Sequence, residues 1–164
     1  MVLLGFQALF VFCMCYAVVS DFRELLIPNW IVATLVAAFP FFAVFYLEPL
    51  SVLWHFLIAL VVLVFATAFF AVNWIGGGDV KLMIGAALWA GPQHIANFLL
   101  AMSALGFLIA IVLLLLRTTY GTLIAGVLPD NWLLRRLRVL AREGQCPYGV
   151  AIGAAGIVAV HHIF

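Results

Sequence analysis

Residues 76–92 read GGGDVKLMIGAALWAGP, and this stretch determines how many times the chain crosses a membrane. Its apolar part, residues 80–90, is short for a bilayer crossing at about 1.5 Å per residue. It carries no charge after Lys81, however, and glycine-containing breaks bound it on both sides. We therefore count it as a span, and we expect neighbouring helices to cover its backbone.

The composition places the whole chain in a bilayer. Hydrophobic residues make up 69% of 164, only 8% are charged, and the mean hydropathy is +1.34. Soluble domains have about 45–50% apolar and about 25% charged residues. The sequence predicts a single all-α integral membrane domain, residues 1–164, with about six transmembrane helices and no nucleic-acid partner. The predicted spans are residues 2–20, 27–47, 51–74, 80–90, 95–116 and 147–164.

The first span is expected to be retained, because residues 1–20 lack a basic start and a clear signal-peptide cleavage site. With six alternating spans, all seven basic residues fall on one side of the membrane. Without a crossing at 80–90, the later arginines would lie on the opposite side from Arg23 and Lys81. The positive-inside rule then puts the basic side in the cytoplasm and both termini outside it. The opposite side receives Glu48, His55, His94, His161 and His162.

Residues 129–144 differ from the spans, because they predict an amphipathic helix that lies in the membrane interface. Asp130 is the expected N-cap and Gly144 the expected stop. The helix has two open interpretations, a cytoplasmic anchor that sets topology or a surface that docks substrate. Its apolar face has Leu133, Leu137 and Leu140, and its basic residues include Arg135, Arg138 and Arg142.

Two aspartates lie at the cytoplasmic edge of this arrangement. Asp21 follows the first span, and Asp79 begins the fourth. Carboxylates at the membrane edge are costly to desolvate, which makes them candidates for function, although each one alone would also serve as a helix cap. If the two meet, they share a proton, so that one activates water while the other donates a proton to a carbonyl. The topology permits that contact but does not require it.

The residues around Asp79 suit such a site. Gly76, Gly77 and Gly78 are expected to end the third span, to let backbone approach closely, and to place Asp79 near a helix start. Lys81 has two open interpretations, a charge beside the site that contacts substrate or a topology anchor. We expect no metal or cofactor, because the three cysteines lack ligand spacing.

Three segments together resemble the type IV prepilin peptidases, which are GxGD membrane aspartyl proteases. They are DFRELLIPN at 21–29, GGGDVKL at 76–82 and PYG at 147–149. The resemblance implies that Asp21 and Asp79 are the catalytic pair. It also implies a substrate with a short basic leader and a hydrophobic helix, cut after a glycine at the cytoplasmic face of the bacterial inner membrane.

The chain differs from many members of that family in one respect. Only residues 23–28 separate the first two spans, and no CxxC pair is present. This resembles the short, peptidase-only members of tight-adherence (Flp) pilus systems, and it argues against N-methyltransferase activity. Three other classes stay open: a small channel or transporter subunit with membrane acids, another GxGD intramembrane protease, and a structural assembly protein that would tolerate Asp79→Asn.

Overall fold

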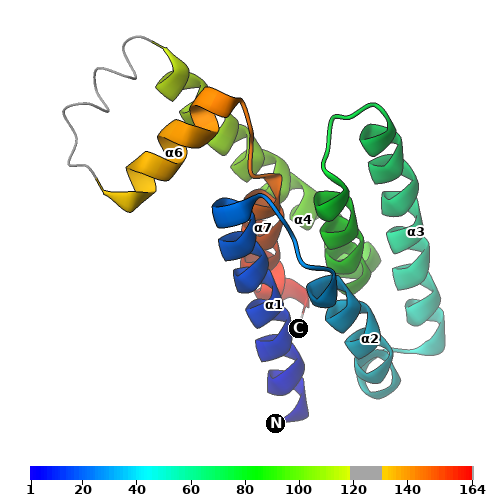
Figure 1. Ribbon diagram of the computed structural model, residues 1–164. Helices are drawn as coiled ribbons and strands as arrows, with labels where there is room; N and C mark the ends of the chain where they lie inside the picture. The colour runs from blue at the N-terminus through cyan, green and yellow to red at the C-terminus, as the bar shows by residue number, and fades with distance from the viewer. Residues whose placement is uncertain (119–130, 164) are drawn as a thin grey trace.

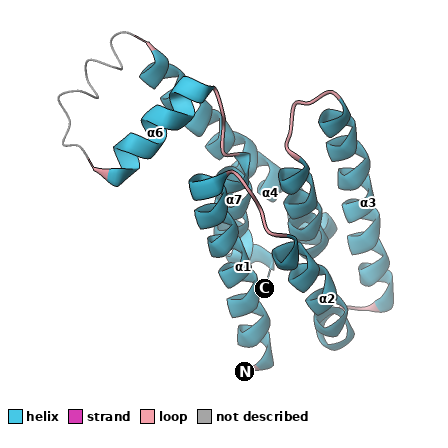
Figure 2. Cartoon of the chain, viewed as in Figure 1, coloured by secondary structure: helices cyan, strands magenta, loops and turns pink. Residues whose placement is uncertain are grey.

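The computed structural model describes residues 1–118 and 131–163 of the chain. Every regular element in those residues is an α-helix (Figures 1 and 2). The all-α fold class predicted from the sequence is therefore confirmed. The helices are α1 (Val2–Glu24), α2 (Asn29–Tyr46), α3 (Pro49–Ala71), α4 (Gly77–Arg117), α6 (Trp132–Glu143) and α7 (Tyr148–Ile163).

The long helices have the dimensions and surface of membrane spans. α1, α2, α3 and α4 are each long and apolar enough to cross a bilayer, and α7 contains a shorter apolar helix, Tyr148–Val160. α3 exposes large apolar side chains such as Leu53, Phe56 and Phe65. Such a surface is stable only against lipid or another apolar partner. The chain is a multi-pass membrane protein.

α4 consists of two arms that meet at Gly91. The backbone there has φ 60° and ψ −172°, and Pro92 follows. The chain reverses direction at this point (Figure 1). The imidazole of His55 hydrogen-bonds the carbonyl oxygen of Leu88 at 2.7 Å, and a Cβ at Gly91 would lie 2.2 Å from that ring. Glycine is required here both by the left-handed φ and by the lack of space. The fourth and fifth predicted spans lie on either side of this turn.

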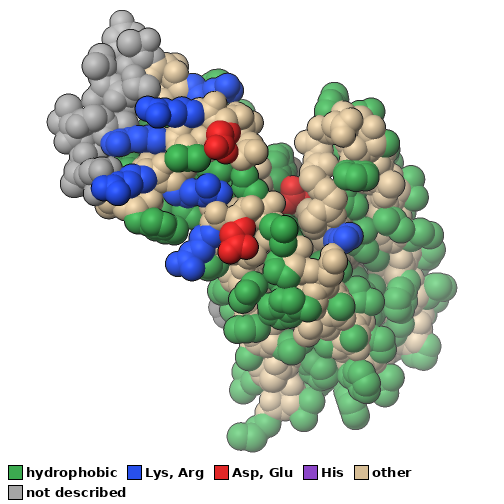
Figure 3. All heavy atoms as spheres, in the orientation of Figure 1, with side chains coloured by type: hydrophobic (Ala, Val, Ile, Leu, Met, Phe, Trp, Pro, Cys, Tyr) green, Lys and Arg blue, Asp and Glu red, His purple; other side chains and the backbone are tan. Residues whose placement is uncertain are grey.

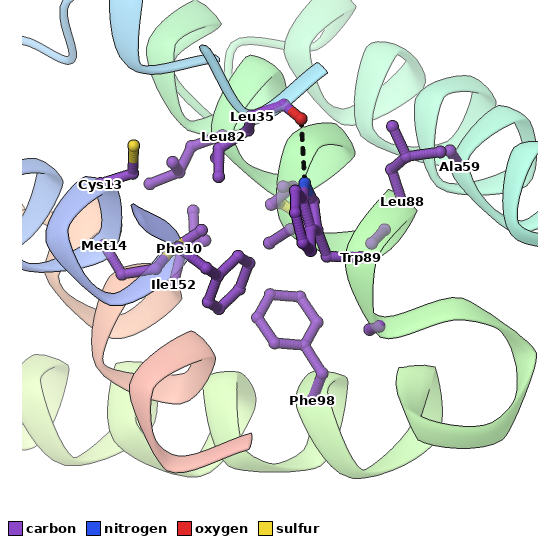
Figure 4. Packing of buried hydrophobic residues seen from close by; sticks show 14 of the residues in the cluster. Phe10, Cys13, Met14, Leu35, Ala59, Leu82, Leu88, Trp89, Phe98 and Ile152 are labelled. Carbon is purple, nitrogen blue, oxygen red and sulfur yellow. Dashed lines mark hydrogen bonds between the residues drawn. The ribbon is translucent and has the colours of Figure 1, made fainter. Parts of the chain in front are cut away.

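The first arm of α4 is the centre of the molecule. Its residues 85–91 are all buried. Trp89 is 1% exposed, and its Nε1 donates a hydrogen bond to the carbonyl oxygen of Leu35 at 3.0 Å (Figure 4). The rings of Phe10 and Phe42 pack beside it. A short apolar segment is stable here because other helices, rather than lipid, surround it.

Glycines on one face of α7 let this helix approach α1 closely. A Cβ at Gly153 would lie 2.9 Å from the carbonyl oxygen of Met14, and one at Gly156 would lie 2.9 Å from the Met14 sulfur. Small residues at such spacing permit backbones to pack tightly in a membrane, where apolar burial alone gives little driving force. This packing brings the start of α7 to the C-terminal end of α1.

The end of the third span differs from the prediction. The sequence indicates a span to residue 74 that the glycine run terminates, but α3 ends at Ala71. Asn73 adopts φ 58°, a left-handed conformation that asparagine tolerates better than most residues. Gly76 is instead the N-cap of α4, and Gly77 and Gly78 belong to its first turn.

α6 also begins later than predicted. Asp130, the expected cap, lies outside the described residues, and the side chain of Asn131 accepts the capping hydrogen bond from the Leu134 N–H at 2.9 Å. Gly144 ends the helix at φ 72°, as predicted. Leu140 and Ala141 are buried against Leu113 of α4. Most Lys and Arg side chains on the visible face gather at this end of the molecule (Figure 3).

Candidate active site

Asp21 is held in the last turn of α1. Its side chain is only 4% exposed. The helix stops at Leu25, which has a left-handed backbone and whose N–H donates to the carbonyl oxygen of Asp21. Ser20 Oγ donates a 2.6 Å hydrogen bond to the carbonyl oxygen of Leu26. These bonds fold the connection to α2 back over the helix end and so define where the carboxylate lies.

The carboxylate of Asp21 lies at the N-terminus of α7. The Val150 N–H donates to Asp21 Oδ2 at 3.1 Å, and the Gly149 N–H also faces this carboxylate. The first N–H groups of a helix have no partner within it and carry partial positive charge. The start of α7 therefore stabilises the Asp21 carboxylate, although the donor Val150 lies 129 residues further along the sequence.

Asp79 also lies at the N-terminus of α7. It is the third residue of α4 and is partly buried. The backbone N–H groups of Gly76 and Gly149 both face its carboxylate. The Gly149 N–H thus faces both Asp21 and Asp79. The two carboxylates also interact electrostatically. The two aspartates that the sequence analysis singled out therefore lie together in the folded chain.

Gly149 is the residue that the sequence analysis did not place in the site. A Cβ at this position would lie 2.8 Å from Asp21 Cγ and 2.7 Å from Ile27 Cδ1. Only glycine fits between the aspartate and the connection to α2. The signal in the sequence was the PYG segment at 147–149, which contributed to the family resemblance but to no site prediction.

The three glycines before Asp79 have different surroundings. A Cβ at Gly76 would lie 3.1 Å from Asp79 Oδ2, and one at Gly78 would lie 3.3 Å from Ile27 Cβ. Gly77 instead faces the ring of Phe70. Gly76 and Gly78 thus let the start of α4 approach its own aspartate and the α1–α2 connection.

Lys81 lies near the aspartates in the sequence but bonds elsewhere. Its Nζ donates to Asn29 Oδ1 at 2.9 Å, and its side chain is exposed. This bond joins the start of α4 to the start of α2. It supports a positioning role for Lys81, and the charge remains accessible from outside.

Arg136 of α6 is a further neighbour that the sequence analysis did not single out. Its Nε donates to the carbonyl oxygen of Phe22 at 2.9 Å, and its charge interacts with Asp21. The ring of Trp132 packs edge-on against Phe22 with centroids 5.7 Å apart. The guanidinium of Arg23 lies 5.6 Å from the centre of the Trp132 ring. α6 is thereby attached to the helix end that holds Asp21.

Cys146 lies in the segment between α6 and α7, near the two aspartates. The side chain reaches the surface. Neighbouring atoms still crowd the thiol, so that desolvation, followed by the charges of Asp21 and Asp79, raises its pKa. Among the described residues, no group of three or more His, Cys, Asp or Glu side chains is arranged to hold a metal ion.

The fold and this site define a class of protein. It is a multi-pass, all-helical membrane protein with two interacting carboxylates, one at the end of α1 and one at the start of α4. The chain belongs to the type IV leader peptidase family, whose profile it matches over residues 8–128. The matched residues include Asp21 and Asp79 but not Gly149. Membership makes the chain a peptidase of the prepilin peptidase kind, which acts in pilus biogenesis. No curated protein and no solved structure matches the chain closely enough to add a comparison.

Proposed function

We propose that the chain is an aspartyl endopeptidase that removes the short basic leader of type IV-like prepilins at the cytoplasmic face of the membrane. The observation that carries this proposal is the meeting of two carboxylates, from α1 and α4, at the single N–H of Gly149. An aspartyl hydrolysis needs two acids close enough to share a proton. Lys81, which is near Asp79 in the sequence, donates its hydrogen bond to Asn29 and does not form a salt bridge with either aspartate.

The chemistry then follows from the pair. One aspartate, ionised, takes a proton from a water molecule while the water oxygen attacks the scissile carbonyl carbon. The other, protonated, gives its proton to the carbonyl oxygen, and a tetrahedral diol forms. When the carbon–nitrogen bond breaks, the first aspartate donates its new proton to the leaving amine nitrogen. The second aspartate takes a proton back from a diol hydroxyl, so the pair returns to its starting state.

The surroundings support peptide access. The exposed backbone at Gly76 and the small residues beside the pair allow an extended peptide to come close, and a glycine at the cleaved bond would ease the same approach. The basic end of the molecule faces the cytoplasm in this proposal, where the leader of the substrate also lies. N-methylation is not part of the proposed function, and Gly76, Gly77, Gly78 and Lys81 support the pair without reacting.

The test is cleavage by the purified protein in lipid or detergent, with prepilins from its own host as substrates. Asp21→Asn and Asp79→Asn are each expected to lower kcat/KM by about 10²–10⁴-fold, because asparagine keeps the shape but neither accepts nor donates the catalytic proton. Thermal unfolding and size-exclusion profiles control for loss of fold.

Two results would contradict the proposal. Cleavage that survives in either variant would exclude a two-aspartate mechanism. A folded parent that cleaves none of the prepilins would instead favour a channel or transporter subunit, in which neutralising one acid changes ion flux.

A further inference from the structure

An apolar groove runs between α3 and the second arm of α4. Its volume is about 720 Å³. Its lining includes Phe65, Ala66 and Phe69 of α3, Met102 and Ser103 of α4, and Tyr148 of α7. The polar groups among the lining side chains are the hydroxyls of Ser103 and Tyr148 and the indole N–H of Trp74, and the rest are apolar.

The groove leads to the paired aspartates. Tyr148 precedes Gly149, whose N–H faces both carboxylates. Trp74 and Ile75 form another part of the wall and precede Gly76, which adjoins Asp79. Two separate segments of the lining therefore continue directly into the site.

The dimensions suit a short stretch of α-helix. A helix about 10 Å wide occupies roughly 420 Å³ per turn, so the groove holds between one and two turns. Lipid is as apolar as the lining, so binding depends on packing rather than on removal from water. The small side chain of Ser103 allows a backbone to approach closely, and Met83 and Met102 adapt to different side chains.

We propose that this groove binds the apolar helix that follows the leader in the substrate, with the N-terminal end of that helix at Tyr148. The inference rests on the proposed function, in which the cleaved bond lies just before such a helix. A helix in the groove has its first turn beside the aspartates and its second turn between α3 and α4 within the membrane. The groove thus selects substrates by their membrane segment, separately from the leader.

The kinetic test fills the groove with one large side chain. Ser103 is exposed in the groove. Leu108, on the same arm of α4, is 58% exposed and lies outside the lining, about 140° around the helix at 100° per residue. Ser103→Trp is expected to lower kcat/KM for a full-length prepilin at least about tenfold more than for a leader peptide without the apolar helix. Leu108→Trp is expected to leave kcat/KM for both substrates at the parental value.

The outcomes separate this inference from the proposed function. If the Ser103→Trp variant loses kcat/KM equally on both substrates, or on neither, the groove does not bind the substrate helix. Cleavage by the parent would still support the proposed peptidase function. A photo-cross-linking amino acid, placed in an Asp79→Asn background, tests binding without turnover. At Ser103 it is expected to label the apolar helix of the prepilin, and at Leu108 only lipid. Lipid labelling alone at Ser103 would also overturn the groove.

Discussion

At the scale of single residues, the site depends on one backbone amide. Gly149 offers its N–H to both carboxylates and leaves the space that Asp21 occupies. Val150 adds a second amide to Asp21. These donors belong to the first turn of α7, so the fold supplies fixed positive partial charge in addition to the charge of Arg136. The aspartates thereby have a defined position before any substrate binds.

Replacing this glycine is therefore expected to damage the site. In Gly149→Ala the new methyl group would lie 2.8 Å from Asp21 Cγ, so the carboxylate has to move. A displacement of about 1 Å at a reacting group can cost about 10²-fold in rate, which is the expected loss of kcat/KM. Gly5→Ala is the matched control, because nothing lies within 4 Å of a Cβ there. A Gly149→Ala enzyme with parental activity would show that this amide does not organise the pair.

At the scale of helices, α6 acts as a clamp on the end of α1. Arg136 binds the carbonyl oxygen of Phe22, one residue after Asp21. Trp132 contacts both Phe22 and Arg23. The carbonyls at a helix C-terminus lack intrahelical partners, and a cation stabilises them there. The helix that the sequence predicts as an interfacial anchor or a docking surface thus also supports the position of Asp21.

Loss of the Arg136 side chain is expected to loosen that clamp. A hydrogen bond with a charged donor contributes about 1.5–3 kcal/mol, so Arg136→Gln is expected to lower the free energy of unfolding by about that amount. Denaturation in detergent measures the stability, and cleavage of a prepilin measures the activity, which is expected to fall as well. Arg142→Gln, at an exposed position of the same helix, is the control.

Arg136→Lys separates charge from geometry in this clamp. Lysine keeps the positive charge near Asp21 but not the rigid fork of the guanidinium. We expect it to restore part of the lost activity. If Arg136→Gln and Arg142→Gln behave alike in both measurements, the contact with Phe22 contributes nothing to the site.

At the scale of the whole molecule, the distribution of charge predicts the orientation in the membrane. Most of the visible basic side chains gather at the end that carries α6 (Figure 3), whereas Glu48 lies in the connection between α2 and α3. Alternating crossings place that connection on the opposite side of the membrane from α6. By the positive-inside rule, we expect α6 and the paired aspartates at the cytoplasmic face.

This orientation is testable with a membrane-impermeant thiol reagent. In a background with Cys13, Cys15 and Cys146 replaced by alanine, Arg142→Cys is expected to react only in inverted vesicles. Glu48→Cys is expected to react only in right-side-out vesicles, since both positions are exposed but at opposite ends. The reverse pattern would put the aspartates on the outer face, where a leader in the cytoplasm is out of reach.

Some features of this protein follow from neighbouring residues and were predictable from the sequence. The length and polarity of apolar runs set the helical membrane class, because a bilayer of fixed thickness imposes a length on each crossing. The short segment at 80–90 was counted as a span because the basic residues fit no other arrangement; it is helical in the structure, and its crossing of the membrane stays a prediction. The aspartates stood out because acids are costly at a membrane edge. The local sequence and the solvent are enough to determine each of these features.

Other features depend on contacts between distant residues, and only the tertiary structure determines them. The shared amide of Gly149 lies more than a hundred positions from Asp21, and the contact of Arg136 with Phe22 spans 114. The groove beside the pair exists because α3 and the two arms of α4 pack at one angle rather than another. Even the end of α3 at Ala71 departs from the apolar pattern. Helix packing in lipid depends on the shapes of small residues on facing helices, and no property of one segment alone specifies its partner.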